Sequence, residues 1–212
     1  MKKKGYTEIL NYIYESAIKI RILRYLAGSS EYNRYSCRDI AKALKISPST
    51  ASLILTSLEY LNIVKKDIIS KTHLYCYNNE SYIVQDIILP GFYKERKLND
   101  TAGQYAVSII KKESISVVMY GSSVNGTDTT DSDYDMCVIV ENQKTKNSVE
   151  KKLNDIAHNF SLKFGKPLSP YILTLSEFKH RFKDKAGIVI EIIKTGKLLY
   201  GKRLQTLALK KD

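Results

Sequence analysis

The N-terminal part of the chain carries three helical patterns of apolar residues. In residues 7–27 apolar side chains recur every three or four positions, which predicts one amphipathic helix. A second helix is expected from Ser36, a good N-cap with Asp39 as its acidic partner. Ser47 as N-cap and Pro48 as first helical residue open a third helix. Its expected buried side consists of Ala51, Ile54, Leu55, Leu58 and Leu61.

Two short strands and a long helical stretch follow. Residues 63–69 and 72–77 are predicted to form a hairpin joined at Ser70-Lys71. Residues 81–112 carry a further helical pattern, which is expected to break at Pro90-Gly91. We expect this stretch to connect two domains.

The C-terminal part alternates strands and helices, which indicates a mixed α/β sheet. A strand at 117–120 and a second one ending at Val140 precede a helix over 148–164. The segment 187–195 is ambiguous between helix and strand. The remaining expected elements are a strand at 166–175, a helix from a capping box at 174–177 to about 185, and a strand at 196–201.

Composition and charge narrow the class of protein. Lys and Arg number 34 against 22 Asp and Glu, so the net charge of +12 favours a polyanionic partner, or reflects a lysine-rich proteome. Apolar runs fall far short of the ~18 residues that a membrane span needs, and no signal-peptide pattern is present. Three isolated cysteines (Cys37, Cys76 and Cys137) fit a reducing cytoplasm. We therefore expect a cytoplasmic protein.

The candidate chemistry lies between the predicted strands at 117–120 and 136–140. Asp133 and Asp135 are two positions apart, so on extended backbone both carboxylates leave the same face. Two such charges repel unless a cation holds them, and hard oxygen ligands beside a small polar loop indicate Mg²⁺ and a phosphate.

Other known loops fit this segment less well. A calcium-binding EF-hand loop needs Gly where Met136 stands and Glu where Asn142 stands. Gly121 and Gly126 have the spacing of a P-loop, but Thr127 replaces its lysine. A polar hairpin with solvated aspartates is the alternative that stays open.

Gly121-Ser122, ten intervening residues and Asp133-Tyr134-Asp135 resemble the signature of the nucleotidyltransferase superfamily, closest to its minimal, MNT-type members. The resemblance implies that Gly121 and Ser122 bind the nucleotide's phosphates. It also implies that Asp133 and Asp135 are catalytic residues that bind the metal, Mg²⁺.

The stretch RDIAKALKISPSTASLILTSLEYLNIVKK resembles winged helix-turn-helix regulators. This resemblance implies that the third helix enters the major groove and that the hairpin wing contacts the DNA backbone. Winged helices also serve as dimerisation or protein-docking modules, and a homodimer is expected if the chain meets DNA half-sites. The candidate DNA-binding residues are Ser47, Ser49, Thr50, Ser52 and Thr56 on the helix and Lys65, Lys66 and Lys71 on the wing.

The predicted fold class is therefore α+β (mixed), with an N-terminal winged helix-turn-helix and a C-terminal mixed α/β nucleotidyltransferase-like domain. The expected domains are a DNA-binding domain at 1–81, a helical connector at 82–112 and the nucleotidyltransferase-like domain at 113–212.

Active transferases of this class usually carry a third carboxylate on the next core strand. Ser169 or Pro170 stands there in this chain, and Glu191 would substitute only if 187–195 were a strand beside the aspartates. Three functions follow. The first and favoured one is a DNA-binding enzyme that transfers NMP from an NTP to a hydroxyl of a partner. The others are a regulator that senses nucleotide without turnover, and an MNT-type antitoxin acting on a HEPN-type toxin.

Overall fold

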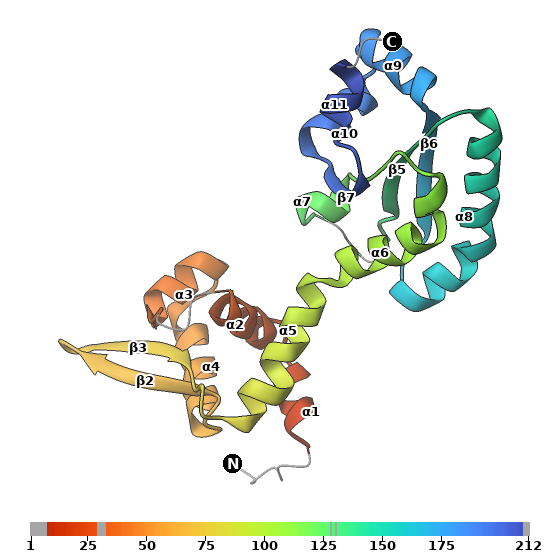
Figure 1. The fold of residues 1–212 in the computed structure, drawn as a ribbon. Coiled ribbons are helices and arrows are strands. Elements are labelled where there is room, and N and C mark those ends of the chain that lie inside the picture. Colours follow the sequence, from red (N-terminus) through yellow and green to blue (C-terminus); the bar gives the residue numbers. More distant parts are fainter. Residues whose placement is uncertain (1–7, 29–32, 128, 130, 210–212) are drawn as a thin grey trace. The chain divides into compact units, whose positions relative to one another are not determined.

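The computed structural model describes residues 8–28, 33–127, 129 and 131–209. The chain divides into two compact units, Met1–Arg96 and Lys97–Asp212 (Figure 1). This division falls inside the segment expected as a connector. The expected functional boundaries at 81 and 112 stay predictions.

The N-terminal unit has the element order of a winged helix-turn-helix, as the sequence predicts. Helix α2 (Ala17–Ala27) is followed by α3 (Cys37–Leu44), α4 (Pro48–Tyr60) and the hairpin of β2 (Val64–Ile69) with β3 (Thr72–Tyr77). A short strand, β1 (Tyr35–Ser36), pairs with β3 and gives the strand order β1-β3-β2.

Local capping explains where these helices begin. The capping box between Ser36 and Asp39 opens α3, and the Ser47 hydroxyl accepts the backbone N–H of Thr50 at 3.0 Å to open α4. Ser70 and Lys71 both have positive φ, as a two-residue hairpin turn of type I′ requires. The apolar sides of the helices and of the hairpin form one core, centred on Ile22, Leu23, Ile40, Leu55, Leu58 and Ile63.

Two expectations about the helices of this unit are wrong. The single helix expected over 7–27 is interrupted at Glu15-Ser16, so α1 (Ile9–Tyr14) and α2 are separate. Ser16 has extended backbone, and its hydroxyl accepts the N–H of Lys19 at 3.4 Å. A local N-cap therefore overrides a continuous apolar pattern.

The expected break at Pro90-Gly91 is also wrong. A π-helical segment, η2 (Ile83–Ile88), continues directly into α5 (Leu89–Arg96). The Leu89 N–H bonds to the Val84 carbonyl, which makes a wider turn just before Pro90. Pro90 directly follows this wider turn, so the helical path continues although the proline has no N–H to donate. The helical path is interrupted instead at Lys97, before α6 (Leu98–Ile110).

The C-terminal unit is built on a mixed sheet with the strand order β6-β5-β4-β7. Strand β4 (Ser116–Met119) pairs antiparallel with β5 (Tyr134–Val140) and with β7 (Lys197–Gly201). Strand β6 (Leu168–Thr174) runs parallel to β5. This mixed α/β unit confirms the predicted fold class.

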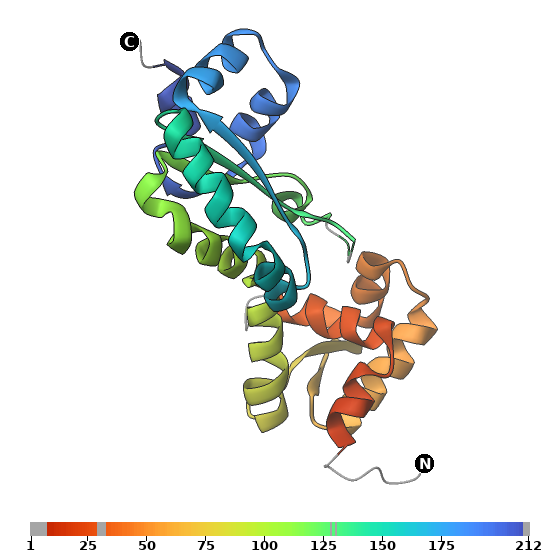
Figure 2. The same cartoon turned by 90° about the vertical axis from the view of Figure 1, so that its right-hand side faces the viewer.

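Helices cover both faces of this sheet. Helices α6 and α8 (Gln143–Phe164) pack on one face, and α8 runs along the sheet in Figure 2. The opposite face is covered by α9 (Leu175–Lys183), α10 (Gly187–Thr195) and α11 (Leu204–Leu209). The ambiguous segment 187–195 is thus a helix. Helix α8 begins five residues before the expected Ser148, because the side chain of Asn142 caps it by accepting the N–H of Thr145 at 3.0 Å.

Candidate nucleotide and DNA sites

The loop between β4 and β5 folds back over the start of β5. Gly121 has φ 71° and ψ −151°, a conformation that is essentially restricted to glycine. It leads into a single helical turn, α7 (Ser122–Asn125), within the segment that the sequence indicates as a small polar loop. The N–H of Tyr120 donates to the Asp135 carbonyl at 3.2 Å and holds the start of the loop against β5.

Gly121 and the side chain of Asp135 are in direct contact. A Cβ atom added to Gly121 would overlap the Oδ2 atom of Asp135. The predicted phosphate-binding glycine therefore lies beside one of the predicted metal ligands, although 13 residues separate them in the sequence. Only a residue without a side chain leaves room for this arrangement.

The two aspartates differ in their surroundings. Asp133 is exposed and immediately precedes β5, whereas Asp135 is the second residue of the strand and is half-buried. Burial raises the pKa of Asp135 above its usual range, the Asp133 carboxylate raises it further, and a hydrogen bond from Ser169 partly offsets both effects. Two neighbouring carboxylates that repel each other fit a divalent cation.

The register of β6 shows which residue stands opposite the aspartates. Asp135 pairs with Ser169, and Met136 pairs with Pro170. Because paired residues in a parallel sheet share a face, Ser169 is the one that lies beside the Asp135 side chain. A hydroxyl therefore occupies the place where the resemblance led us to look for a third carboxylate.

Glu191 lies on helix α10, so the condition under which it would replace that carboxylate from a neighbouring strand is not met. Its side chain is exposed. Its negative charge still contributes to the raised pKa of Tyr120, the residue between β4 and Gly121. Burial raises the pKa of Tyr120 to about 12, with Asp135 as the next contributor and Glu191 as a smaller one.

Helix α6 supports the loop between β4 and β5. It packs on the sheet face opposite to the one that carries Asp135. The side-chain amide of Asn99 donates to the backbone oxygen of Ser123 at 3.1 Å, and the Tyr134 hydroxyl donates to the Asn99 carbonyl at 2.9 Å. Gly103 makes room for the Tyr134 hydroxyl, because a Cβ there would overlap it. Sequence reasoning missed these residues. The alternation of the strand was the available signal, since Tyr134 between the two aspartates must face the opposite core.

Ser122 is the first residue of α7 and is half-buried, while Ser123 is 7% exposed. Among the residues that the structure describes, the Ser123 hydroxyl is one of the few buried polar groups without a hydrogen-bond partner. Ser123 lies on α7, the helical turn that follows Gly121. Within the same described part of the chain, no cluster of three or more His, Cys, Asp or Glu residues forms a metal site.

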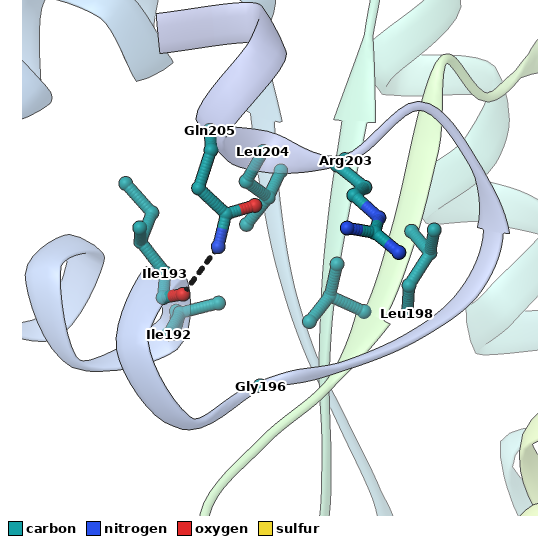
Figure 3. Close-up of a pocket in the computed structure, with 8 residues that line it drawn as sticks. Ile192, Ile193, Gly196, Leu198, Arg203, Leu204 and Gln205 are labelled. Atoms are coloured by element: carbon teal, nitrogen blue, oxygen red, sulfur yellow. Dashed lines mark hydrogen bonds between the residues drawn. The ribbon is translucent and has the colours of Figure 1, made fainter.

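A separate hollow lies between α10, β7 and α11. It is lined mainly by apolar residues, together with Arg203 and Gln205, and the Gln205 amide donates to the Ile193 carbonyl at 2.8 Å (Figure 3). The predicted phosphate and metal residues are not part of its lining. We therefore do not place the nucleotide in it.

The predicted DNA-binding residues are mostly exposed. Ser47, Ser49, Ser52 and Thr56 are exposed on α4 and its cap, whereas Thr50 is half-buried and hydrogen-bonds to Ser47 at 2.7 Å.

On the wing, Lys71 is exposed at the turn between β2 and β3. Lys65 and Lys66 form ion pairs with Glu80 and Glu59, each at 2.9 Å. The Lys65–Glu80 pair is exposed, and exposed ion pairs are weak, so it does not prevent Lys65 from meeting a phosphate; the Lys66–Glu59 pair is half-buried.

Among the described residues, no helix has both the length and the apolar character to cross a membrane.

The sheet order, the glycine-led loop and the paired aspartates define the C-terminal unit as a nucleotidyltransferase-type domain. Residues 106–205 match the family described as polymerase beta, nucleotidyltransferase. This region is therefore a nucleotidyltransferase domain of the polymerase beta family, joined to a winged helix. Comparison with curated proteins gave no match.

Three solved structures show weaker similarity. The AntR antimony-specific transcriptional repressor is 18% identical with a TM-score of 0.37, over 49% of this chain and 93% of that chain. The adhesin competence repressor AdcR from Streptococcus pyogenes is 15% identical with a TM-score of 0.33, over 48% and 74%. A toxin-antitoxin with AMP-PNP is 15% identical with a TM-score of 0.34, over 52% and 82%. These similarities are too low to indicate what this protein does.

Proposed function

We propose that this protein is a DNA-binding regulator whose nucleotidyltransferase domain binds a Mg²⁺-nucleoside triphosphate. Gly121 and Ser122 hold the phosphates, and Asp133 and Asp135 hold the metal. The observation that carries the proposal is the contact between Gly121 and the Asp135 carboxylate, which brings the loop and the aspartates to one point.

The chemistry of the donor set supports Mg²⁺. Two carboxylates, one of them half-buried with a raised pKa, leave negative charge that a divalent cation and its bound phosphates balance. When bound, Mg²⁺ would supply charge neutralisation for the phosphates. The chain's own part is to orient the nucleotide through the backbone of the loop, which Asn99 and Tyr120 hold in place.

The winged helix supplies the DNA-binding part of the proposal. Helix α4 presents short polar side chains, and the wing presents Lys65, Lys66 and Lys71. The net charge of +12 agrees with a polyanionic partner. A homodimer on two half-sites fits this mode of binding.

NMP transfer is the second candidate function. The paired aspartates favour it, because such a pair positions a triphosphate for attack by a hydroxyl. A bond from the acceptor oxygen to the α-phosphorus would form while the bond to pyrophosphate breaks. Ser169 opposite Asp135 weighs against efficient turnover, since a serine is a poor base for the acceptor's proton. The acceptor would be a partner protein, with a toxin as one class.

Nucleotide binding is tested by calorimetry with Mg²⁺-ATP and Mg²⁺-GTP. The wild type is expected to bind at least one of them, and the Asp133→Asn/Asp135→Asn variant is expected to lose binding while keeping its fold. Unchanged binding by this variant would refute the site. Label transfer from α-labelled NTPs to a host lysate then separates the two candidates. A labelled product absent with the variant establishes transfer, whereas binding without label supports a nucleotide-sensing regulator.

DNA binding is tested by titration of the full chain into duplex DNA at several salt concentrations. The logarithm of the binding constant falls as the logarithm of the salt concentration rises. Lys65→Ala/Lys66→Ala is expected to make this negative slope shallower by about 2, because two phosphate contacts are lost. The matched control is Lys144→Ala/Lys151→Ala, which removes the same charge from exposed positions of α8. Equal slopes in both variants would remove Lys65 and Lys66 from the DNA-binding surface.

A further inference from the structure

The exposed face of α4 has an unusual composition for a helix that meets DNA. Ser49, Ser52, Leu53, Thr56 and Tyr60 recur at spacings of three and four and share one side of the helix. Leu53 is 75% exposed and Tyr60 is 67% exposed. Short hydroxyl side chains surround the leucine, so its isobutyl group extends beyond them.

Helix α4 lacks the side chains that usually read bases in pairs of hydrogen bonds. Residues 48–60, all of them described, contain no Arg, Lys, Asn or Gln. The one charged residue, Glu59, is half-buried and pairs with Lys66 at 2.9 Å. Bidentate recognition of guanine or adenine is therefore not available to this helix. Hydroxyl contacts and apolar contacts remain.

The base edges of the major groove offer one apolar group, the C5-methyl of thymine. A leucine that projects from the middle of a polar helix face matches this group in chemistry. We propose that Leu53 determines sequence specificity by packing on thymine methyl groups, so that α4 selects thymine at defined positions of the DNA site. This inference rests on the proposed DNA binding, and it adds which base helix α4 recognises.

The surroundings of α4 favour DNA over a protein as the occupant of this face. Arg38 and Lys42 are exposed on α3, and Lys45 is exposed at its C-terminal end, between the two helices. The start of α3 lies against the start of α4, since the Cys37 thiol contacts the Pro48 carbonyl oxygen at 3.3 Å. Asp39 is the one exposed carboxylate of α3, and it is bound in the capping box with Ser36, so exposed cations dominate the surroundings of the α4 face and fit a polyanion.

Uracil provides the test, because it keeps the hydrogen-bonding pattern of thymine and lacks only the methyl group. The full-length wild type first selects duplexes from a randomised library. The selected duplex is then compared, by fluorescence anisotropy, with versions in which single thymines are replaced by uracil. Wild type is expected to lose affinity by about fourfold at each position where Leu53 contacts the methyl group.

Leu53→Ala is expected to bind the thymine and uracil duplexes equally well. The substitution is on the surface, and circular dichroism checks that the fold is kept. Leu162→Ala is the matched control, since Leu162 is a 73% exposed leucine on α8 in the other unit. It is expected to keep the wild-type preference for thymine.

Two results would overturn the inference while leaving the proposed DNA binding intact. In one, wild type binds a selected duplex but is indifferent to uracil at every position. In the other, Leu53→Ala keeps the full thymine preference. A wild type that binds no duplex would refute both the inference and the DNA-binding function, and would point to a protein as the occupant of this face.

Discussion

The hydrogen atom that replaces a side chain at Gly121 is what allows the loop and Asp135 to meet. Gly126 ends helix α7 within the same loop, also has positive φ (67°), and has no atom of the described residues within 4 Å of the place where a Cβ would lie. Both glycines have positive φ, but Gly121 lies in a region essentially restricted to glycine and Gly126 in the left-handed helical region, and among the described residues only Gly121 also has a spatial requirement. They form a natural pair for comparison.

Gly121→Ala is expected to abolish binding of Mg²⁺-nucleotide and to destabilise the C-terminal unit by more than Gly126→Ala does. The strained backbone alone costs about 1–3 kcal/mol in each variant. The overlap with Asp135 adds to that cost only at Gly121. Calorimetry measures binding and denaturant unfolding measures stability. Equal losses of binding in both variants would show that the contact with Asp135 is unimportant.

Ser169 offers a direct experiment on catalysis, because it is the residue paired with Asp135. Ser169→Asp places a carboxylate beside the aspartate pair and is expected to raise label transfer by about a hundredfold, the lower part of the range for a general base. Ser169→Asn, similar in size but uncharged, is the control and should leave the rate unchanged. If both variants transfer at the wild-type rate, a missing carboxylate at this position does not limit the reaction.

Helix α9 follows β6 through a capping box that is tied to α8. The Glu177 N–H donates to the Thr174 hydroxyl, and the Glu177 carboxylate accepts the Thr174 N–H at 2.7 Å and the Lys146 ammonium at 2.9 Å. Burial alone would raise the pKa of Glu177, but the hydrogen bonds from Thr174 and Lys146 outweigh it and lower the pKa. The connection fixes α9 on the sheet face that also carries Asp135.

This pKa shift predicts an acid-sensitive stabilisation. Since the folded carboxylate binds its proton less tightly than the unfolded one, the contribution is fully present above the ordinary pKa of about 4.5. It is lost as the pH falls through the lower folded value. Glu177→Gln is expected to reduce the free energy of unfolding by roughly 0.5–1 kcal/mol at pH 7 and to have little effect at strongly acidic pH.

Denaturant unfolding across this pH range makes the measurement. Lys146→Met should remove part of the same pH dependence, because it deletes one of the two groups that lower the pKa. A constant difference between wild type and Glu177→Gln at all pH values would contradict the assignment.

Each of the two compact units has its own hydrophobic core. Units with separate cores usually unfold separately. We expect two thermal unfolding transitions. Mg²⁺-nucleotide is expected to raise the midpoint temperature only of the transition that belongs to the C-terminal unit. At a hundred times Kd the stabilisation amounts to about 2.7 kcal/mol. Differential scanning calorimetry makes the measurement, with Asp133→Asn/Asp135→Asn as the control that should lose the shift. A single transition that moves as a whole would show instead that the units unfold as one.

The amino-acid sequence by itself determined the fold class of each unit, a winged helix-turn-helix and a mixed α/β domain. It also singled out the central residues of the candidate site. Apolar periodicity and local caps such as Ser36 and Ser47 depend on neighbouring residues, so they can be recognised without a partner segment. The same holds for the loop glycine and the aspartate pair, whose spacing is local. Where local signals competed, as at Ser16 and Pro90, the sequence reading was wrong, because caps and wide helical turns override an average pattern.

Only the tertiary structure decided which distant residues meet. Strand register places Ser169, and not Pro170, beside Asp135. The folded loop brings Gly121 against the same carboxylate, and Asn99 from α6 holds that loop. Such contacts depend on how the strands pair and how the helices pack on them. A shift of one residue in the register of a strand would turn every one of its side chains to the other face of the sheet.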